Sequence, residues 1–109
     1  MKLHDKLNDL LETFRKLRDP KVGCPWDREQ DFKSIASCAV EEAYEVADAI
    51  EREDYDSLKS ELGDLLFQII FHSKIAEENK LFTLEDVVSE LNDKLVRRHP
   101  HIFDKEDVN

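Results

Sequence analysis

The stretch ELGDLLFQIIFH, residues Glu61 to His72, decides the fold of this chain. We expect it to be helical, because its apolar residues fit a repeat of about 100° per residue. Around that helix the apolar side chains point in nearly every direction, and the remaining narrow stripe carries Glu61, Asp64, Gln68 and His72. A helix that is apolar nearly all round is normally buried. This one would therefore carry two carboxylates into a protein interior, where they are costly unless paired or bound to a metal.

The composition of the chain favours long helices in one small domain. Among 109 residues there are Gly 2 and Pro 3, which leaves little material for turns and hairpins. We therefore predict an all-α fold in which residues 1–109 form a single domain. The formal net charge of -10 would repel a nucleic-acid backbone, so we expect no nucleic-acid polymer as a partner.

The sequence also predicts a cytoplasmic protein that does not bind a membrane. The N-terminal segment is amphipathic and charged rather than signal-like, and no apolar run is long enough to span a bilayer. Cys24 and Cys38 are fourteen positions apart, which is neither a metal-binding nor a redox spacing. We expect both thiols to be reduced.

Hydrophobic periodicity predicts four long helices. They cover approximately residues 2–17, 32–52, 57–78 and 84–98. Asp54 or Asp56 is a candidate N-cap for the third helix and Thr83 for the fourth, which Pro100 would stop. Between the first two helices, residues 19–27 contain two prolines and a glycine and read as a loop, which holds the only tryptophan, Trp26.

One glycine interrupts the third helix. Gly63 costs about 1 kcal/mol relative to alanine inside a helix, and it lies directly before Asp64. Close approach of another helix or of a ligand is the best explanation for a glycine at this position.

Two pairs of acidic residues carry the chemistry. Glu42 with Glu45, and Glu61 with Asp64, are each spaced i, i+3, so each pair lies on one face of its helix. Antiparallel packing of the two helices would bring the pairs together. Four carboxylates would then repel one another unless a hard divalent cation bound between them, and all-oxygen ligation suits Mg²⁺ or Mn²⁺.

The carboxylates have two other interpretations. In a chain with 26 acidic residues, either pair taken alone is most simply a solvated helix face. A di-iron helical bundle would need Glu-x-x-His on two helices. No histidine here has a glutamate three positions before it, which argues against iron.

With these residues in view, the chain resembles the MazG family of all-α nucleoside triphosphate pyrophosphohydrolases. Glu41-Glu42-Ala43-Tyr44-Glu45 followed by Glu61-Leu62-Gly63-Asp64 looks like the EExxE…ExxD signature of that superfamily. The segments CPWD at 24–27 and KLVRRHPHIF at 94–103 make the resemblance specific, and it runs over nearly the whole chain.

The resemblance implies a four-to-five-helix bundle that assembles as a homodimer or larger, with the third helix partly buried by a partner subunit. It implies Mg²⁺-dependent hydrolysis of nucleoside triphosphates, ribo or deoxy, to the monophosphate and pyrophosphate. Carried over by position, the metal ligands would be Glu42, Glu45, Glu61 and Asp64. Glu41 would have an outer or water-orienting role. Substrate contacts would come from Lys94, Arg97 and Arg98 at the phosphates and Trp26 near the base or sugar; His99 and His101 are weaker candidates.

Other functions remain open at this point. Many MazG proteins carry two such domains, and this chain resembles the N-terminal one, so it is either a complete protein or a fragment. It could bind a nucleotide or alarmone as a dimerisation module with little turnover. A dUTPase-like enzyme or a phosphoribosyl-ATP pyrophosphohydrolase of the same fold is a further alternative, which the tryptophan loop and the RRHPH tail disfavour.

Overall fold

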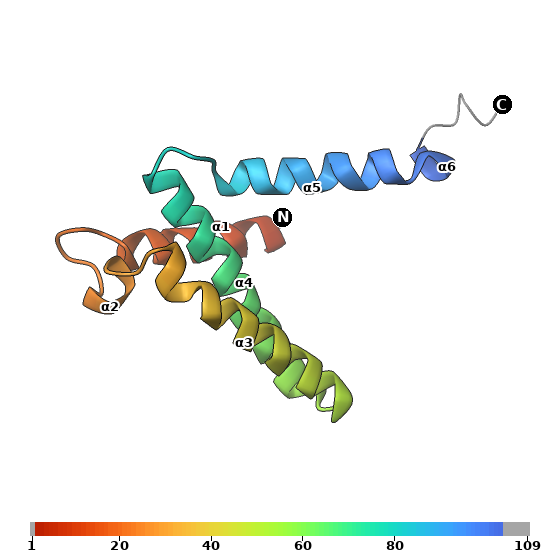
Figure 1. Cartoon of the computed structure of the whole chain (residues 1–109), viewed down its shortest axis with the longest axis horizontal. Coiled ribbons are helices and arrows are strands. Elements are labelled where there is room, and N and C mark those ends of the chain that lie inside the picture. The colour runs from red at the N-terminus through yellow and green to blue at the C-terminus, as the bar shows by residue number, and fades with distance from the viewer. Residues whose placement is uncertain (1, 104–109) are drawn as a thin grey trace.

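The computed structural model describes residues 2–103, which form helices and no strand (Figure 1). The elements are α1 (Lys2–Leu17), α2 (Pro25–Arg28), α3 (Phe32–Glu51), α4 (Tyr55–Glu78), α5 (Leu84–Arg98) and α6 (Pro100–Phe103). The all-α prediction is confirmed. The four long helices begin and end within two residues of the predicted bounds.

Side-chain caps explain why three of these helices begin where they do. The Asp54 carboxylate accepts a hydrogen bond of 3.1 Å from the backbone N–H of Ser57 at the start of α4. Thr83 and Asp86 form a reciprocal capping box at the start of α5, and Asp31 and Ser34 form another at α3. Each cap satisfies backbone donors that the first helical turn leaves free. The predicted caps Asp54 and Thr83 are thereby confirmed.

The segment 19–27 is not entirely a loop, as the sequence had suggested, because α2 forms within it. Proline at the first helical position has a suitable backbone angle and no N–H to leave unpaired, which favours a helix starting at Pro25. The preceding turn needs its glycine, since a Cβ on Gly23 would lie 2.5 Å from the carbonyl oxygens of Leu17 and Asp19. Pro100 ends α5 as predicted but also begins the short helix α6.

The helices are arranged around an antiparallel hairpin of α3 and α4 (Figure 1). The α1 helix crosses the later part of α4, and α5 leaves the end of α4 and runs apart from the hairpin. No helix within residues 2–103 combines the length and apolar character needed to cross a lipid bilayer.

The core of the molecule lies where α1, α3 and the second half of α4 meet. Its buried side chains are Phe14, Ile35, Ile70, Phe71 and Ile75. The rings of Phe14 and Phe71 pack edge to face with centroids 5.2 Å apart, a favourable arrangement for aromatic quadrupoles. This contact fixes α1 across α4.

Arg18 joins the segment containing α2 to this core. Its guanidinium pairs with the Glu78 carboxylate, including a hydrogen bond of 3.0 Å from Nε, and lies 5.3 Å from the ring centroid of Phe71. It also donates to the backbone carbonyls of Asp27 and Gln30. The Arg18 side chain is only 7% exposed. One buried cation thus ties together α1, the residues around α2 and the end of α4.

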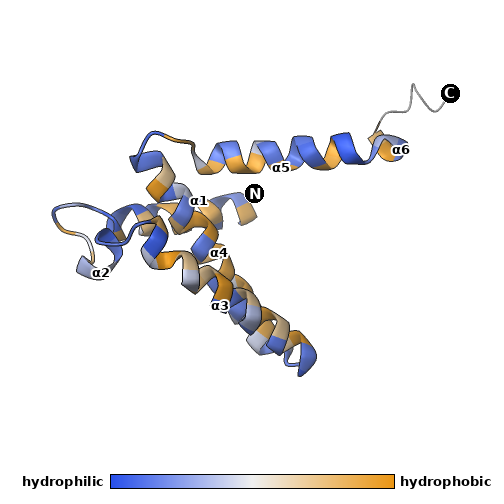
Figure 2. Ribbon diagram, in the orientation of Figure 1, coloured by the Kyte–Doolittle hydropathy of each residue, from blue (hydrophilic) through white to orange (hydrophobic). Residues whose placement is uncertain are grey.

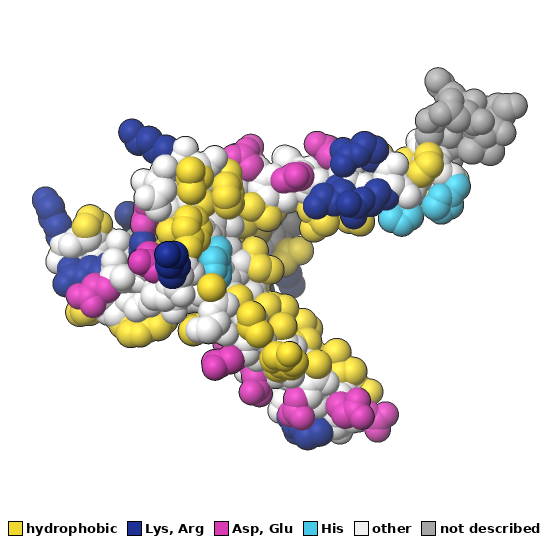
Figure 3. All heavy atoms as spheres, in the orientation of Figure 1, with side chains coloured by type: hydrophobic (Ala, Val, Ile, Leu, Met, Phe, Trp, Pro, Cys, Tyr) yellow, Lys and Arg dark blue, Asp and Glu magenta, His cyan; other side chains and the backbone are white. Residues whose placement is uncertain are grey.

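The first half of α4 is not buried by its own chain, contrary to the expectation from its apolar circumference. Leu62 and Leu66 remain 48% and 40% exposed, and Ile69, just beyond the midpoint of α4, remains 45% exposed. Figure 2 shows apolar residues continuing along the hairpin and along α5, and Figure 3 shows such side chains on the flanks of both. The physical reason is that α5 diverges and no other described helix covers this face. Likewise, nothing in residues 2–103 lies within 4 Å of the position of a Cβ on Gly63, so no other described helix packs closely there.

Candidate active site

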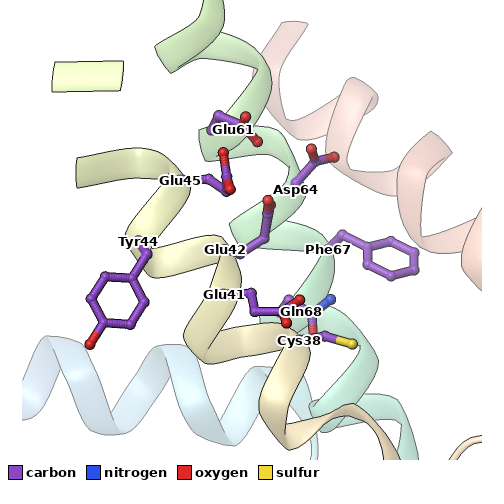
Figure 4. A pocket seen from close by; sticks show the side chains of 9 residues that line it. All are labelled: Cys38, Glu41, Glu42, Tyr44, Glu45, Glu61, Asp64, Phe67 and Gln68. Atoms are coloured by element: carbon purple, nitrogen blue, oxygen red, sulfur yellow. The ribbon is translucent and has the colours of Figure 1, made fainter. Parts of the chain in front are cut away.

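The α3–α4 hairpin brings both predicted acidic pairs to one pocket. The pocket has a volume of about 690 Å³. Figure 4 shows the side chains that surround it, which come from the middle of α3 and the middle of α4. The lining residues are Cys38, Glu41, Glu42, Tyr44, Glu45, Glu61, Asp64, Phe67 and Gln68. The i, i+3 spacing on each helix and the antiparallel turn between them produce this convergence, as the sequence predicted.

Three carboxylates form the centre of the pocket. One oxygen from each of Glu42, Glu61 and Asp64 lies within 4.8 Å of the other two. Glu42 and Glu61 are partly buried, whereas Asp64 is exposed to the pocket. Partial burial raises the pKa of Glu42, and the nearby negative charge of Glu61 raises it further. The cluster is therefore electrostatically unfavourable as it stands.

These residues fit a divalent cation. Glu42 has one oxygen, Oε2, that is buried and has no hydrogen-bond partner. A hard cation would both pair that oxygen and remove the repulsion between the three carboxylates, and oxygen donors of this kind are the ligands that Mg²⁺ and Mn²⁺ prefer. Glu42, Glu61 and Asp64 would hold the ion.

Two further glutamates line the pocket outside this trio. Glu45 is exposed, and the group of carboxylates within mutual reach does not include it. Glu41 is also exposed, in line with the expectation that it points outward, yet it still reaches the pocket wall. Both are close enough to act on a ligand that fills the pocket.

The predicted substrate-binding residues lie elsewhere in the chain. Trp26 is 52% exposed and packs edge-on against Phe71, with ring centroids 6.1 Å apart. Lys94, Arg97 and Arg98 lie on the second half of α5, where Figure 3 shows basic side chains gathered. None of the four lines the acidic pocket within one chain.

The two tail histidines are exposed and belong to the end of α5 and to α6. The Nδ1 atom of His99 lies 2.6 Å from the carbonyl oxygen of Leu95, which places a donor proton on that nitrogen. Its ring lies 5.7 Å from that of His101, centroid to centroid. This local packing gives neither histidine a contact with the carboxylates.

Four neutral residues of the pocket were not predicted as site residues: Cys38, Tyr44, Phe67 and Gln68. A signal for Gln68 existed, because it shares the polar stripe of α4 with Glu61 and Asp64. Phe67 and Tyr44 gave no such signal, since aromatic residues at helical spacing usually belong to a core.

The fold and the site together define an all-α protein with a carboxylate cluster suited to a divalent cation. Residues 30–103 match the family profile described as "MazG nucleotide pyrophosphohydrolase domain". The match covers more than half of the chain and includes the whole α3–α4 hairpin. The chain belongs to the MazG family.

The names of two curated relatives agree with this family. The chain is 52% identical over 99 residues to a "Nucleoside triphosphate pyrophosphohydrolase" of Escherichia coli K12, covering 91% of this chain and 38% of the relative. It is 48% identical over 95 residues to "Nucleoside triphosphate pyrophosphohydrolase/pyrophosphatase MazG" of Thermotoga maritima, covering 87% and 37%. A protein of Bacillus subtilis, "Uncharacterized protein YabN", is 42% identical over 101 residues, covering 93% and 20%. The chain thus spans less than two fifths of the length of these relatives.

Proposed function

We propose that this chain hydrolyses nucleoside triphosphates, ribo or deoxy, to the monophosphate and pyrophosphate in a Mg²⁺-dependent reaction. The observation that carries the proposal is the meeting of three carboxylates from two helices at an open pocket. The names of the curated relatives support the same activity. An acidic pocket repels a free triphosphate, so a bound cation is needed to invert the local field.

Each acidic residue has a proposed role. Glu42, Glu61 and Asp64 are the metal ligands, and Glu45 completes the set from the adjacent turn of α3. Bound there, Mg²⁺ or its substitute Mn²⁺ would neutralise phosphate charge and lower the pKa of a coordinated water. Glu41 orients the attacking water at the pocket wall and accepts its proton. The bond between the α and β phosphates breaks, and pyrophosphate leaves with the bridging oxygen.

We further propose that the working form is a homodimer or a larger assembly. The radius of gyration is 17.2 Å, whereas a compact domain of this length has about 13 Å. Exposed apolar faces on the hairpin and on α5 suit contact with a second copy. In that assembly Lys94, Arg97 and Arg98 would meet phosphate oxygens, and Trp26 would lie near the base or sugar. The free thiols Cys24 and Cys38 are consistent with a cytoplasmic site of action.

The test is pyrophosphate release from the eight common ribo- and deoxyribonucleoside triphosphates, with Mg²⁺ and with EDTA. We expect metal-dependent release by the wild type and at least a hundredfold loss in Glu61→Gln, because one charged ligand is removed. Glu51→Gln, which also removes a charge from the hairpin but lies outside the pocket, is the matched control and should keep full activity.

Two outcomes would redirect the proposal. Tight nucleotide binding without pyrophosphate release would indicate a binding module rather than an enzyme. Release from one pyrimidine nucleotide alone would favour a dUTPase-like specificity over a broad one.

A further inference from the structure

Gln68 is a buried polar side chain that lines the acidic pocket and lacks a partner. The residue is 8% exposed, and its Oε1 atom is buried without a hydrogen bond. Buried amide groups in native proteins nearly always have a partner, so an orphan calls for an explanation. Among the pocket residues only Gln68 and Glu42 have such an atom, and a cation accounts for that of Glu42.

The polar side chains that flank Gln68 on α4 have no free donor to offer it. Gln68 also borders an apolar groove formed with residues that include His72 and Ser73. The Nδ1 atom of His72 already bonds the backbone oxygen of Gln68 at 2.7 Å, and Ser73 Oγ donates to the Ile69 carbonyl at 2.8 Å. The other side chains of this groove are apolar. The missing partner must therefore come from outside these residues, and the acidic pocket is the open side.

The position of Gln68 in the pocket indicates which part of a bound nucleotide would supply the missing hydrogen-bond partner. Gln68 follows Asp64 by one helical turn, about 6 Å along α4. Figure 4 shows Gln68 and Cys38 at the end of the pocket away from Glu61 and Glu45. With the phosphates held at the carboxylates and the α phosphate on the side of Gln68, the group that extends toward Gln68 would be the sugar, which adjoins the α phosphate.

We infer that the Gln68 carboxamide binds a hydroxyl of the substrate sugar and so sets the sugar preference of the site. This inference rests on the proposed function. A hydroxyl both donates and accepts, so it pairs with the carboxamide whichever of its two ends faces the pocket. A substrate that lacks the hydroxyl would leave the buried amide unpaired, which is how a polar site rejects an analogue.

The experiment combines two variants with four nucleotides. Gln68→Met and Gln68→Leu keep the approximate volume of the side chain but remove its hydrogen-bonding groups. Each variant and the wild type are assayed for kcat/KM on ATP and on its 2′-deoxy, 3′-deoxy and 2′,3′-dideoxy forms. Isothermal titration with the α,β-methylene analogues of ATP and of dideoxy-ATP, in Mg²⁺, gives a second readout that needs no turnover.

We expect Gln68→Met to lose about tenfold in kcat/KM and in affinity on the nucleotides that carry the contacted hydroxyl, the loss typical of one hydrogen bond. On dideoxy-ATP the variant and the wild type should be equal. The melting temperature without nucleotide should not fall, because an unpaired buried amide is replaced by an apolar group. A purely structural glutamine would show the opposite: a lower melting temperature and an equal loss on all four nucleotides.

Three results would overturn the inference. They are an equal loss on all four nucleotides, no loss on any of them, or a loss that follows the base when GTP and CTP series are compared. Failure of the proposed function has a different signature, since the wild type would then neither release pyrophosphate nor bind the methylene analogues.

Discussion

The two halves of α4 have similar apolar content but opposite surroundings. In the second half, Ile70, Phe71 and Ile75 are 3%, 0% and 2% exposed, since α1 and α3 cover them. In the first half, Leu62 and Leu66 remain 48% and 40% exposed. The buried side chains of the second half are covered by the same chain, whereas the first half carries Glu61 and Asp64 of the acidic pocket and has an uncovered face.

This difference explains how one helix serves both stability and function. Burial of apolar surface around Phe71 contributes the free energy that holds the fold. The rigid helix then carries Glu61 and Asp64 outward from that core, so their positions are fixed even though their mutual repulsion opposes folding. Apolar burial one or two helical turns away therefore offsets the unfavourable repulsion between these carboxylates.

Truncation of one apolar side chain in each half of α4 should give the largest difference in stability. Phe71→Ala should lower the free energy of unfolding by about 3–5 kcal/mol, because it removes a fully buried ring. Leu66→Ala should cost about 1 kcal/mol in dilute solution, since its side chain is only partly covered. Urea denaturation followed by circular dichroism measures both.

Protein concentration sharpens that test. At high concentration the cost of Leu66→Ala should grow, because a second copy would then cover this face, whereas that of Phe71→Ala should stay constant. Equal losses in the free energy of unfolding for Phe71→Ala and Leu66→Ala in dilute solution would show that the two halves of α4 contribute alike to stability.

Substitution of Gly63 should change the free energy of unfolding by a smaller amount and in the opposite direction. Gly63→Ala should stabilise the dilute chain by about 0.5–1 kcal/mol through helix propensity, as there is open space for the added methyl group. If the glycine serves close approach of a second copy, the same change should raise the dissociation constant of the assembly. Sedimentation measures the second effect, and an unchanged constant would mean that only solvent faces Gly63.

The smallest expected effect concerns pH. The pKa of Glu42 is raised above its usual 4.5, by partial burial and then by Glu61, so the folded state binds more protons than the unfolded state in this range. The metal-free protein should therefore lose stability as pH rises from about that value through the raised pKa. Melting temperatures in EDTA should show this fall for the wild type and a smaller one for Glu42→Gln. A variant with the same pH profile as the wild type would contradict the assignment.

Much of the fold could be predicted because its signals are local. Caps such as Asp54 and Thr83 act on the next three residues, and i, i+3 carboxylates share a helix face whatever surrounds them. The convergence of Glu42, Glu61 and Asp64 followed from a short turn between two helices. These features need no knowledge of distant parts of the chain.

What could not be predicted depends on long-range geometry. The position of Glu45 outside the carboxylate trio depends on helix crossing and side-chain rotamers, which spacing does not specify. The direction of α5, and with it the place of Lys94 and Arg98, is not specified by the hydrophobic periodicity of α5 itself. The sequence alone also does not show that the Gln68 amide oxygen lacks a hydrogen-bond partner, because this depends on which groups surround it in the folded chain.

The buried guanidinium of Arg18 has a consequence for sequence variation among relatives. Its partner Glu78 is sixty positions away, and its other contacts are backbone carbonyls that any residue provides. Loss of the Glu78 charge would leave the buried Arg18 guanidinium without its carboxylate partner. Positions 18 and 78 are therefore expected to change together, as a co-varying pair, whereas the carbonyl contacts of Arg18 place no demand on the side chains at positions 27 and 30.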